Sequence, residues 1–384
     1  MTRRICIVLT TRGNYAKTKS TLRALSQHHG VTLQLVVGGA LLEDGYGEFE
    51  RLIKADGFII DALLRYPAKG ASPHSIAAAA GLCTVKMSNI FSDLKTDAVM
   101  VIADRYEALS IAQAALCMNI RIAHLEGGEI SGSIDERIRH AITKLAHIHF
   151  PANADAAERI LKLGEPSETI HITGTPSLDL LKDIDLNNCD PLRQTLARDS
   201  HGHVVSLDEP FVVVSQHPVV TEYTATRHHY EQTVEAVIQL NIPTIWILPN
   251  DDAGGATVAP LIRDLITNPR APVVCSIGGL ALEDYVVLLK HASCLIGNTS
   301  SGIREGAFLG IPTVNIGSRQ VGRLRGANVI DVGYDHGEIY AAAQHQIRHG
   351  PYPCDPVYGT GHAGKTIAAV LTTTWPDLDK RIGF

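Results

Sequence analysis

The stretch His124–Phe150, HLEGGEISGSIDERIRHAITKLAHIHF, predicts a strand, a glycine-bearing loop and a helix in direct succession. Four apolar residues in its second half follow the spacing of one helical face, which predicts an amphipathic helix packed against a core. These residues are Ile138, Ala141, Ile142 and Leu145. Ser133 and Glu136 match a capping box, which places the start of the helix at the end of the loop.

Two acidic residues and an arginine gather where this strand ends and the helix begins. Residues Ile120–Glu126 predict a buried strand with Glu126 at its carboxyl end, and Asp135 and Arg139 lie one helical turn apart. Ligands of open α/β sheets bind at such junctions, because helix N-termini carry free N–H groups. Glu136 is interpreted as a helix cap, and Asp135 could equally be a partner of the helix dipole. Glu126, between His124 and Gly127 at the end of a strand, has no evident structural purpose, so a purely structural interpretation fits it less well than Asp135 or Glu136.

The whole chain alternates strand-like apolar runs with helical patterns, which predicts parallel sheets covered by helices on both faces. In the first half the expected strands are Arg4–Thr10, Val31–Val37, Ala98–Ala103, Ile120–Glu126, Ile148–Pro151 and Ile170–Thr173, and the expected helices include Tyr15–His28, Pro73–Leu94, Tyr106–Met118 and Ala154–Leu163. In the second half four helices are expected between strands and a fifth, Glu338–His349, after the last strand. The expected strands are Phe211–Ser215, Thr244–Leu248, Val273–Ser276, Cys294–Ile296, Thr313–Ile316 and Val329–Val332.

A polar, turn-rich stretch from Pro176 to Glu209, expected to hold a short helix, separates the two halves. We therefore expect two α/β domains that face each other across a cleft. Their expected bounds are residues 1–178 and 179–360.

The composition narrows the class of protein. The chain has 384 residues, a hydrophobic share of 45% and a formal net charge of −6, without a Lys/Arg block, which argues against nucleic-acid binding. No run of 18 apolar residues predicts a membrane span, and the N-terminal apolar run is too short for a signal sequence. The seven cysteines form no CxxC pair and are interpreted as reduced thiols, so we expect a cytoplasmic protein.

Three loops after strands are candidates for binding phosphate. Thr11–Lys17 carries Arg12 and Lys17 at a helix start, but it is a weak signal because neither a dinucleotide fingerprint nor a P-loop is present. Gly297–Glu305 is stronger, since backbone N–H groups and serine hydroxyls can hold phosphate while Glu305 accepts from ribose hydroxyls. The alternative there is ordinary serine capping of a helix. The loop 318–325 contains three arginines that suit an anion.

Three segments of the chain resemble the hydrolysing UDP-N-acetylglucosamine 2-epimerases of the bacterial sialic-acid pathway and the epimerase half of the animal bifunctional enzyme. The segments are DAVMVIADRYEALSIAQAALCMNIRIAHLEGGEISGSIDERIRHAITKLAHIHF, GNTSSGIREGAFLGIPTVNIGSRQVGR and YPCDPVYGTGHA. The similarity runs in the same order over nearly the whole chain. It implies a GT-B-type architecture, in which a nucleotide sugar lies between two Rossmann-like domains and a C-terminal helix, about residues 361–384, packs back on the first.

The resemblance also implies roles for individual residues. The catalytic set would be Asp104, Glu126, Asp135, Arg139 and His217, with the carboxylates as acids and bases and Arg139 in support. The substrate-binding set would be Arg12, Lys17, Arg105 and Arg323 around the diphosphate, Ser300, Ser301, Gly302 and Glu305 at phosphate and ribose, and Asn250. No metal or redox cofactor is predicted, because neither a metal-ligand cluster nor a nicotinamide fingerprint is present. A homodimer or homotetramer is expected.

This chain departs from the family pattern at two positions. Ile102 and Ala103 stand where the family often has His-Gly before Asp-Arg, and Ala40 stands where many members have histidine. Because these positions concern the sugar, the identity of the sugar stays open. The expected reaction converts UDP-N-acetylglucosamine and water to N-acetylmannosamine and UDP. The alternatives are the same chemistry on UDP-2,4-diacetamido-2,4,6-trideoxyglucose, a non-hydrolysing epimerase, a GT-B glycosyltransferase and a non-catalytic sensor.

Overall fold

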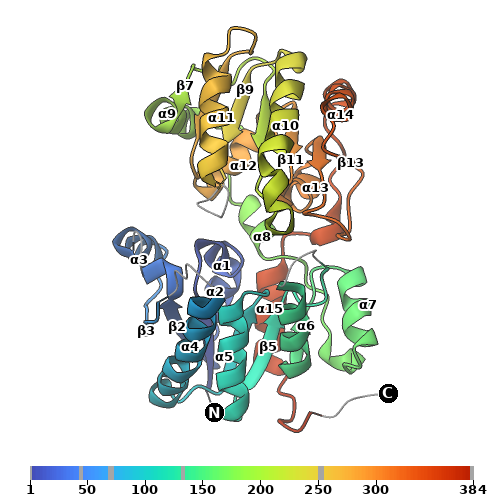
Figure 1. The fold of residues 1–384 in the computed structure, drawn as a ribbon. Helices are drawn as coiled ribbons and strands as arrows, with labels where there is room; N and C mark the ends of the chain where they lie inside the picture. Colours follow the sequence, from blue (N-terminus) through green and yellow to red (C-terminus); the bar gives the residue numbers. More distant parts are fainter. Residues whose placement is uncertain (1, 43–45, 68–72, 131–134, 250–254, 381–384) are drawn as a thin grey trace. The chain divides into compact units, whose positions relative to one another are not determined.

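The computed structural model describes residues 2–42, 46–67, 73–130, 135–249 and 255–380. These residues group into two compact units, which are treated separately below (Figure 1). Unit 1 comprises the described residues up to 180 together with those from 359 onward, and unit 2 comprises those from 181 to 358.

Unit 1 is built on six parallel strands in the order β3-β2-β1-β4-β5-β6. The strands are β1 (Arg3–Leu9), β2 (Val31–Gly38), β3 (Ala62–Leu64), β4 (Ala98–Ile102), β5 (Arg121–Leu125) and β6 (Ile148–Phe150). This is the strand order of dinucleotide-binding sheets, in which the direction of winding reverses between the first and fourth strands. The carboxyl ends of β1 and β4 therefore flank the position where such sheets bind ligands.

Helices cover both faces of this sheet because its strands are apolar on both sides. Ile5, Ile7 and Leu9 point into one core, whereas Cys6 and Val8 point into the other. The helices are α1 (Arg12–Ala16), α2 (Lys19–Ser26), α3 (Tyr46–Ala55), α4 (Pro73–Leu94), α5 (Tyr106–Cys117), α6 (Asp135–Leu145), α7 (Ala154–Lys162), α8 (Ser177–Leu181) and α15 (Ala363–Thr373). The first core is covered mainly by α2, α3 and α15, and the second by α4, α5 and α6.

The last helix, α15, lies in unit 1 although it follows all of unit 2 in the chain (Figure 1). Its Ile367 and Leu371 share a core with Leu22 and Leu25 of α2. The carboxylate of Asp179 accepts hydrogen bonds from the backbone N–H groups of Ala363 and Gly364, at 2.9 and 2.7 Å. Because the first N–H groups of a helix lack partners within it, this carboxylate caps α15 and fixes where it begins.

Unit 2 repeats the same winding around a second sheet. Six parallel strands run in the order β13-β12-β11-β8-β9-β10, and the short β7 adds an antiparallel edge to β10. The strands are β7 (His201–Gly202), β8 (Val212–Ser215), β9 (Thr244–Ile247), β10 (Val274–Ile277), β11 (Cys294–Gly297), β12 (Thr313–Ile316) and β13 (Val329–Val332). The helices are α9 (Asp190–Asp199), α10 (Thr226–Leu240), α11 (Gly255–Thr267), α12 (Leu282–His291), α13 (Glu305–Leu309) and α14 (His336–His349). The winding reverses between β8 and β11.

The predicted fold class, two Rossmann-like domains with parallel sheets, is confirmed, but three local predictions were wrong. Ile170–Thr173 is not a strand and makes only a single bridge, from Ile170 to His149. The sixth strand is β3, whose three residues are too few to show a pattern in the sequence. The helix expected over Tyr15–His28 is divided into α1 and α2 at Thr18, whose hydroxyl hydrogen-bonds to the carbonyl of Asn14.

The structure differs from the expected number of helices in the linking region, residues 176–209. Residues 176–209 hold two helices, α8 and α9, rather than one. Ser133, half of the expected capping box, lies outside the described residues.

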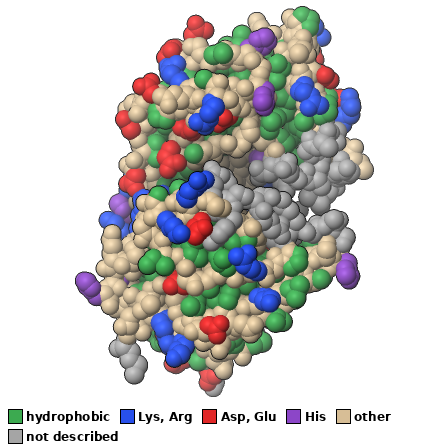
Figure 2. Space-filling view, turned by 90° about the vertical axis from the view of Figure 1, so that its left-hand side faces the viewer, with side chains coloured by type: hydrophobic (Ala, Val, Ile, Leu, Met, Phe, Trp, Pro, Cys, Tyr) green, Lys and Arg blue, Asp and Glu red, His purple; other side chains and the backbone are tan. Residues whose placement is uncertain are grey.

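On the face drawn in Figure 2, described Lys and Arg side chains are interspersed with Asp and Glu. Within the described ranges, no helix is both long and apolar enough to cross a membrane. All seven cysteines are free thiols, four of them buried.

Candidate functional site

The carboxyl edge of the unit 1 sheet brings most of the predicted catalytic residues into one region. Ala103 and Glu126 directly follow β4 and β5, and the backbone N–H of Ala103 bonds to the carbonyl of Leu125. Since β4 and β5 are paired and parallel, Asp104 and Glu126 leave the sheet at neighbouring strand ends. The segment Thr10–Lys17 leaves the adjacent strand β1 at the same edge.

Asp104 and Arg139 form an ion pair that joins the end of β4 to α6. Arg139 is only 2% exposed. One of its terminal nitrogens donates to the Asp104 carboxylate, and the other donates to the backbone carbonyl of Glu129. A guanidinium suits this position because its planar fork can hold two acceptors at once. The pair holds the Asp104 carboxylate, 22% exposed, at the carboxyl edge of the sheet.

Glu126 has the most constrained geometry of the predicted acids. Its backbone lies in the left-handed region, with φ of 60°, and its side chain is 2% exposed. Its Oε2 lies 2.5 Å from Nζ of Lys17, and its Oε1 accepts a 2.6 Å hydrogen bond from the hydroxyl of Thr175. Lys17, assigned from the sequence to a diphosphate, is therefore placed against this carboxylate. The sequence analysis did not identify Thr175 as a site residue, because the only signal near it in the sequence is the turn-forming Pro176.

Arg105, just before α5, and Asp135, the first residue of α6, lie close enough to interact electrostatically. Nε of Arg105 lies 3.2 Å from the carboxylate of Glu107, which is fully buried in the first turn of α5. Burial lowers the pKa of Arg105, but the hydrogen-bonded charge of Glu107 outweighs this effect and raises it. The negative charge of Asp135 acts in the same direction, so Asp135 lies within electrostatic reach of Arg105. Sequence reasoning missed Glu107.

A buried histidine ties the end of β4 to α6. His124 contacts the carbonyl of Ala103 through Nε2, at 2.9 Å, and the hydroxyl of Thr143 through Nδ1, at 3.1 Å. Burial lowers its pKa to about 3, so the ring is neutral and its Nε2–H donates to the carbonyl. His124 therefore supports the backbone beside Asp104 and the helix that carries Arg139.

We expect Ala103→Gly to stabilise the protein, because Ala103 holds the left-handed φ of 57°. The left-handed conformation costs a residue with a β-carbon about 1–2 kcal/mol, and the greater freedom of glycine in the unfolded chain offsets part of the gain. The net result should be a gain of roughly 0.5–1 kcal/mol, measured by denaturant unfolding. Ala98→Gly, at the start of β4, is the control and should lower stability. An Ala103→Gly protein that is less stable than the wild type would contradict the argument.

The corresponding edge of unit 2 holds His217 and the loop after β11. The side-chain oxygen of Asn298 accepts from the backbone N–H of His217 at 2.7 Å, and its Nδ2 donates to the carbonyl of His217 at 2.8 Å. Gly297, the last residue of β11, precedes Asn298 and has φ of 141°, and a β-carbon there would lie 2.1 Å from the carbonyl oxygen of Ser215. Only glycine therefore allows the ends of β8 and β11 to approach this closely. Asn298 was not singled out from the sequence.

His217 should stay neutral across the physiological range. Burial, assisted by the charge of Arg319, lowers its pKa to about 4. We therefore expect its imidazole signals, identified by their loss in His217→Gln, to stay constant from pH 8 to pH 5.5 in NMR spectra. A titration centred near the ordinary histidine pKa of about 6.5 would show that the ring is more exposed than the structure has it. A neutral ring can accept a proton, as a catalytic base must.

The predicted phosphate-binding loop forms a short turn that leads into α13. Ser300–Gly302 is one 3-10 turn, and the hydroxyl of Thr299 accepts from the backbone N–H of Ser301. Thr299, not Ser300, is therefore the residue whose side chain caps this turn. Helix capping does not explain the hydroxyl of Ser300. Glu305 begins α13.

The arginine-bearing loop lies against this turn. Arg319 and Gln320 both donate to the carbonyl of Asn298, at 3.0 and 2.9 Å. The half-buried Arg323 belongs to this loop. Of the predicted binding residues, the side chain of Arg12 and the whole of Asn250 lie outside the described residues.

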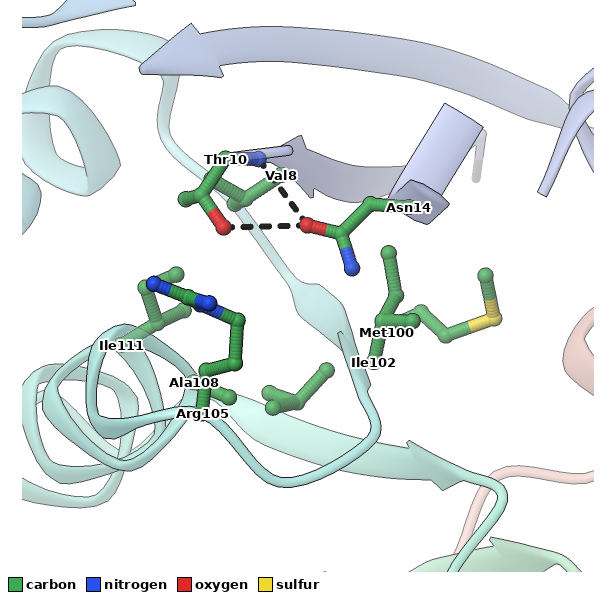
Figure 3. A pocket seen from close by; sticks show the side chains of 9 residues that line it. Val8, Thr10, Asn14, Met100, Ile102, Arg105, Ala108 and Ile111 are labelled. Carbon is green, nitrogen blue, oxygen red and sulfur yellow. Dashed lines mark hydrogen bonds between the residues drawn. The ribbon is translucent and has the colours of Figure 1, made fainter. Parts of the chain in front are cut away.

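A small pocket opens between β1, β4 and the start of α5, where the winding of the unit 1 sheet reverses (Figure 3). Its lining residues are Val8, Thr10, Asn14, Met100, Val101, Ile102, Arg105, Ala108 and Ile111. The pocket adjoins the predicted acids, since Arg105 follows Asp104 directly. Over the described part of the chain, no group of three or more His, Cys, Asp or Glu side chains could hold a metal ion.

Comparisons with known proteins match nearly the whole chain. Residues 23–372 match the family model described as UDP-N-acetylglucosamine 2-epimerase. The UDP-N,N'-diacetylbacillosamine 2-epimerase (hydrolyzing) of Legionella pneumophila is 32% identical over 373 residues, which cover 97% of this chain and 96% of that protein. The GDP/UDP-N,N'-diacetylbacillosamine 2-epimerase (hydrolyzing) of Campylobacter jejuni is 30% identical, over 86% of this chain and 84% of its own length.

A solved structure shares the fold over the same extent. The UDP-GlcNAc 2-epimerase of Neisseria meningitidis bound to UDP-GlcNAc has a TM-score of 0.80 and 15% identity, covering 96% of this chain and 99% of that one. At this identity the likeness concerns the fold, and the family follows from the sequence matches. The match to the family model over residues 23–372 and the 32% identity to the Legionella pneumophila protein show that the chain belongs to the UDP-N-acetylglucosamine 2-epimerase family.

Proposed function

We propose that the protein is a hydrolysing 2-epimerase that converts UDP-N-acetylglucosamine and water to N-acetylmannosamine and UDP, for nonulosonic (sialic) acid biosynthesis. The observation that carries this proposal is the pair of carboxylates at neighbouring strand ends, each held by its own cation. Asp104 pairs with Arg139, and Glu126 pairs with Lys17. Both relatives cited above are named as hydrolyzing 2-epimerases, which supports the same reaction type here.

Epimerisation at C2 by elimination and hydration needs one group to remove a proton and another to return one. A base takes the C2 proton, the electron pair forms a C1=C2 double bond, and the C1–O bond breaks to release UDP. Water then adds its hydroxyl to C1 of the 2-acetamidoglucal, and a proton reaches C2 from the face that gives the manno configuration. Each positioned acid or base typically contributes about 10²–10⁴-fold in rate.

The geometry of unit 1 favours Glu126 as the base in this scheme. Its contact with Lys17 favours the ionised carboxylate, which can accept a proton. Asp104 and Asp135 are then the candidates for returning a proton, and Arg139 holds Asp104 in position. We assign the nucleotide to unit 2, with Ser300, Ser301, Gly302 and Arg323 at phosphate, Glu305 at ribose, and His217 nearby. Arg12, Arg105 and Asn250 remain assigned to substrate binding.

The sugar itself has a second candidate. Two relatives are named for the sugar N,N'-diacetylbacillosamine, which favours UDP-2,4-diacetamido-2,4,6-trideoxyglucose as an alternative substrate. Ile102, at a position where the family often has histidine, is 5% exposed and lines the pocket at the edge of unit 1. An apolar wall there suits a sugar that has fewer hydroxyl groups.

The decisive test incubates the protein with a panel of nucleotide sugars in deuterated water. We expect free UDP, a sugar of inverted C2 configuration, and deuterium at C2 for one of the two substrates. Failure to release nucleotide from any member would reject the proposal, and release only after addition of a sugar acceptor would indicate a glycosyltransferase. Epimerisation that leaves the sugar on UDP would identify a non-hydrolysing enzyme.

We also propose a cytoplasmic homodimer or homotetramer. Seven free thiols fit a reducing compartment. Helix α4 exposes three large apolar side chains, Ile76, Leu82 and Val85, at 40, 45 and 58%. Such a surface is suited to contact with a second copy. Light scattering coupled to size exclusion should therefore report a dimer or tetramer, which Val85→Glu should dissociate.

A further inference from the structure

One of the three arginines in the arginine-bearing loop, residues 318–325, contacts the backbone of the loop itself. Residues 317–328, all within the described part of the chain, lie in neither a helix nor a strand. One terminal nitrogen of Arg325 donates to the carbonyl of Gln320 at 2.8 Å, and the other donates to the carbonyl of Arg323. The Arg325 guanidinium thus closes the second half of this loop into a compact turn.

Asp331 on β13 holds the same guanidinium from the sheet. Its Oδ2 lies 2.6 Å from Nε of Arg325, and its Oδ1 accepts a 2.6 Å hydrogen bond from Nδ2 of Asn315 on β12. The side chain of Arg325 is only 19% exposed. Two neighbouring strands therefore fix the position of the guanidinium, and the guanidinium fixes the conformation of the loop.

The loop is also connected to the strand end that carries His217. Nε2 of Gln320 donates to the carbonyl of Asn298 at 2.9 Å, and the Asn298 side chain bonds to the backbone N–H and carbonyl of His217. The backbone carbonyl of Gln320 is the group that Arg325 holds. Arg325 therefore constrains the carboxyl edge of unit 2 through the backbone of its neighbours.

We infer that Arg325 is a positioning residue, which holds the arginine-bearing loop in the conformation that presents Arg323 to the diphosphate of the nucleotide. This inference rests on the proposed function, which assigns Arg323 to phosphate. A guanidinium suits the role because its rigid planar fork can hold several acceptors at fixed angles, which an ammonium group cannot. A loop that is ordered before the nucleotide arrives loses less conformational freedom on binding, and the affinity is higher for that reason.

Arg325→Gln tests the effect on affinity. We expect the Kd for UDP, measured by calorimetry, and the KM for the nucleotide sugar to rise by roughly 10–100-fold, the size expected when hydrogen bonds from a charged group are lost. The value of kcat should change little, because the bound nucleotide orders the loop once substrate saturates the protein.

Arg348→Gln is the matched control for this substitution. It also removes one positive charge from unit 2, but the exposed Arg348 donates to the carbonyl of Gln344 within α14 and lies outside the loop. Kd and KM should stay at their wild-type values in this variant. An equal rise of Kd in the two variants would overturn the inference, because the loss would then follow from net charge alone.

Two further variants separate positioning from direct contact with phosphate. Lysine keeps the positive charge but not the planar fork, so Arg325→Lys should bind UDP about as weakly as Arg325→Gln. Arg325→Gln should add little to the loss caused by Arg323→Gln, because the guanidinium that the loop presents is then already gone. Full affinity in Arg325→Lys, or losses that add in the double variant, would overturn the inference.

Hydrogen–deuterium exchange without nucleotide measures the order of the loop directly. The backbone amides of residues 318–325 should exchange faster in Arg325→Lys than in the wild type, whereas those of α14 should not change. Faster exchange over the whole of unit 2 would show general destabilisation and would overturn the inference, as would an unchanged loop in a variant that binds UDP weakly.

The outcomes separate this inference from the proposed function. Wild-type affinity for UDP and normal turnover in Arg325→Gln would overturn the inference and leave the epimerase standing. A wild-type protein that binds UDP but releases none from any nucleotide sugar would reject the epimerase, and the UDP affinities of the variants would still decide the role of Arg325.

Discussion

Glu126→Gln should lower kcat by about 10²–10⁴-fold, the usual contribution of a positioned acid or base. Glutamine has nearly the same shape, and its single amide oxygen can accept from Lys17 while its NH2 group donates to the Thr175 hydroxyl, but its amide cannot take the C2 proton. Because Glu126 is 2% exposed, water cannot readily replace it. The measurement is the rate of UDP release at saturating substrate, with affinity followed separately by calorimetry.

Thr175→Val is the control for this prediction. It removes the 2.6 Å hydrogen bond to Oε1 of Glu126 but leaves the carboxylate and its contact with Lys17. Valine has the same shape as threonine, so we expect a loss in kcat of less than about tenfold. If Glu126→Gln retained most of its activity while binding substrate normally, the base would have to be a different residue, with Asp104 and Asp135 the first to examine. Normal binding without turnover would also be the result that distinguishes an enzyme from a sensor.

Glu165→Ala should be the most destabilising substitution among the contacts described here. The Glu165 carboxylate, with no exposed surface, lies 2.5 Å from Nζ of Lys144 and 2.6 Å from Nζ of Lys380, and it also contacts His149. Removing one partner of a buried ion pair typically costs about 3–5 kcal/mol, because the other charge is left uncompensated. Chemical denaturation should show this loss, whereas Glu168→Ala, at an exposed position three residues on, should change stability little.

The same cluster predicts how stability depends on pH. Hydrogen bonds from His149, Lys144 and Lys380 outweigh the effect of burial and lower the pKa of Glu165 to about 2, from an ordinary value of 4.5. A carboxylate whose pKa is lower in the folded state stabilises the protein above the unfolded pKa, and this contribution is lost as the pH falls from 4.5 towards 2. Wild-type stability should therefore fall over this range more steeply than that of Glu165→Gln. Parallel curves would contradict the assignment.

Lys380 connects this cluster to the helix that carries Asp135 and Arg139. Besides Glu165, its ammonium donates to the carbonyls of Thr143, Lys144 and Ala146 at the end of α6. Cations near a helix C-terminus are stabilising. Lys380 thus stabilises the C-terminal end of α6. Lys380→Ala should lower the free energy of unfolding, because it removes these hydrogen bonds and one of the cations that contact Glu165.

The alternation of strands and helices could be predicted because hydrophobic periodicity is local. Segments such as Pro73–Leu94, Ala98–Ile102 and Leu282–His291 show their period within their own residues, and the structure agrees with them. The strand-end positions of Asp104, Glu126 and His217 follow equally from local pattern. The short β3 and the division between α1 and α2 were missed, because three residues show no period and the break depends on one hydroxyl.

By itself, then, the sequence determined the α/β class, the positions of most elements and which polar residues stand at strand ends. Tertiary structure alone decided the strand order that makes β1 and β4 neighbours, the pairing of Lys17 with Glu126, and the pairing of Lys380 with Glu165. The physical reason is distance along the chain. Lys17 and Glu126 are brought together by packing between elements far apart in sequence, and no local propensity records which of several cations will reach a given carboxylate.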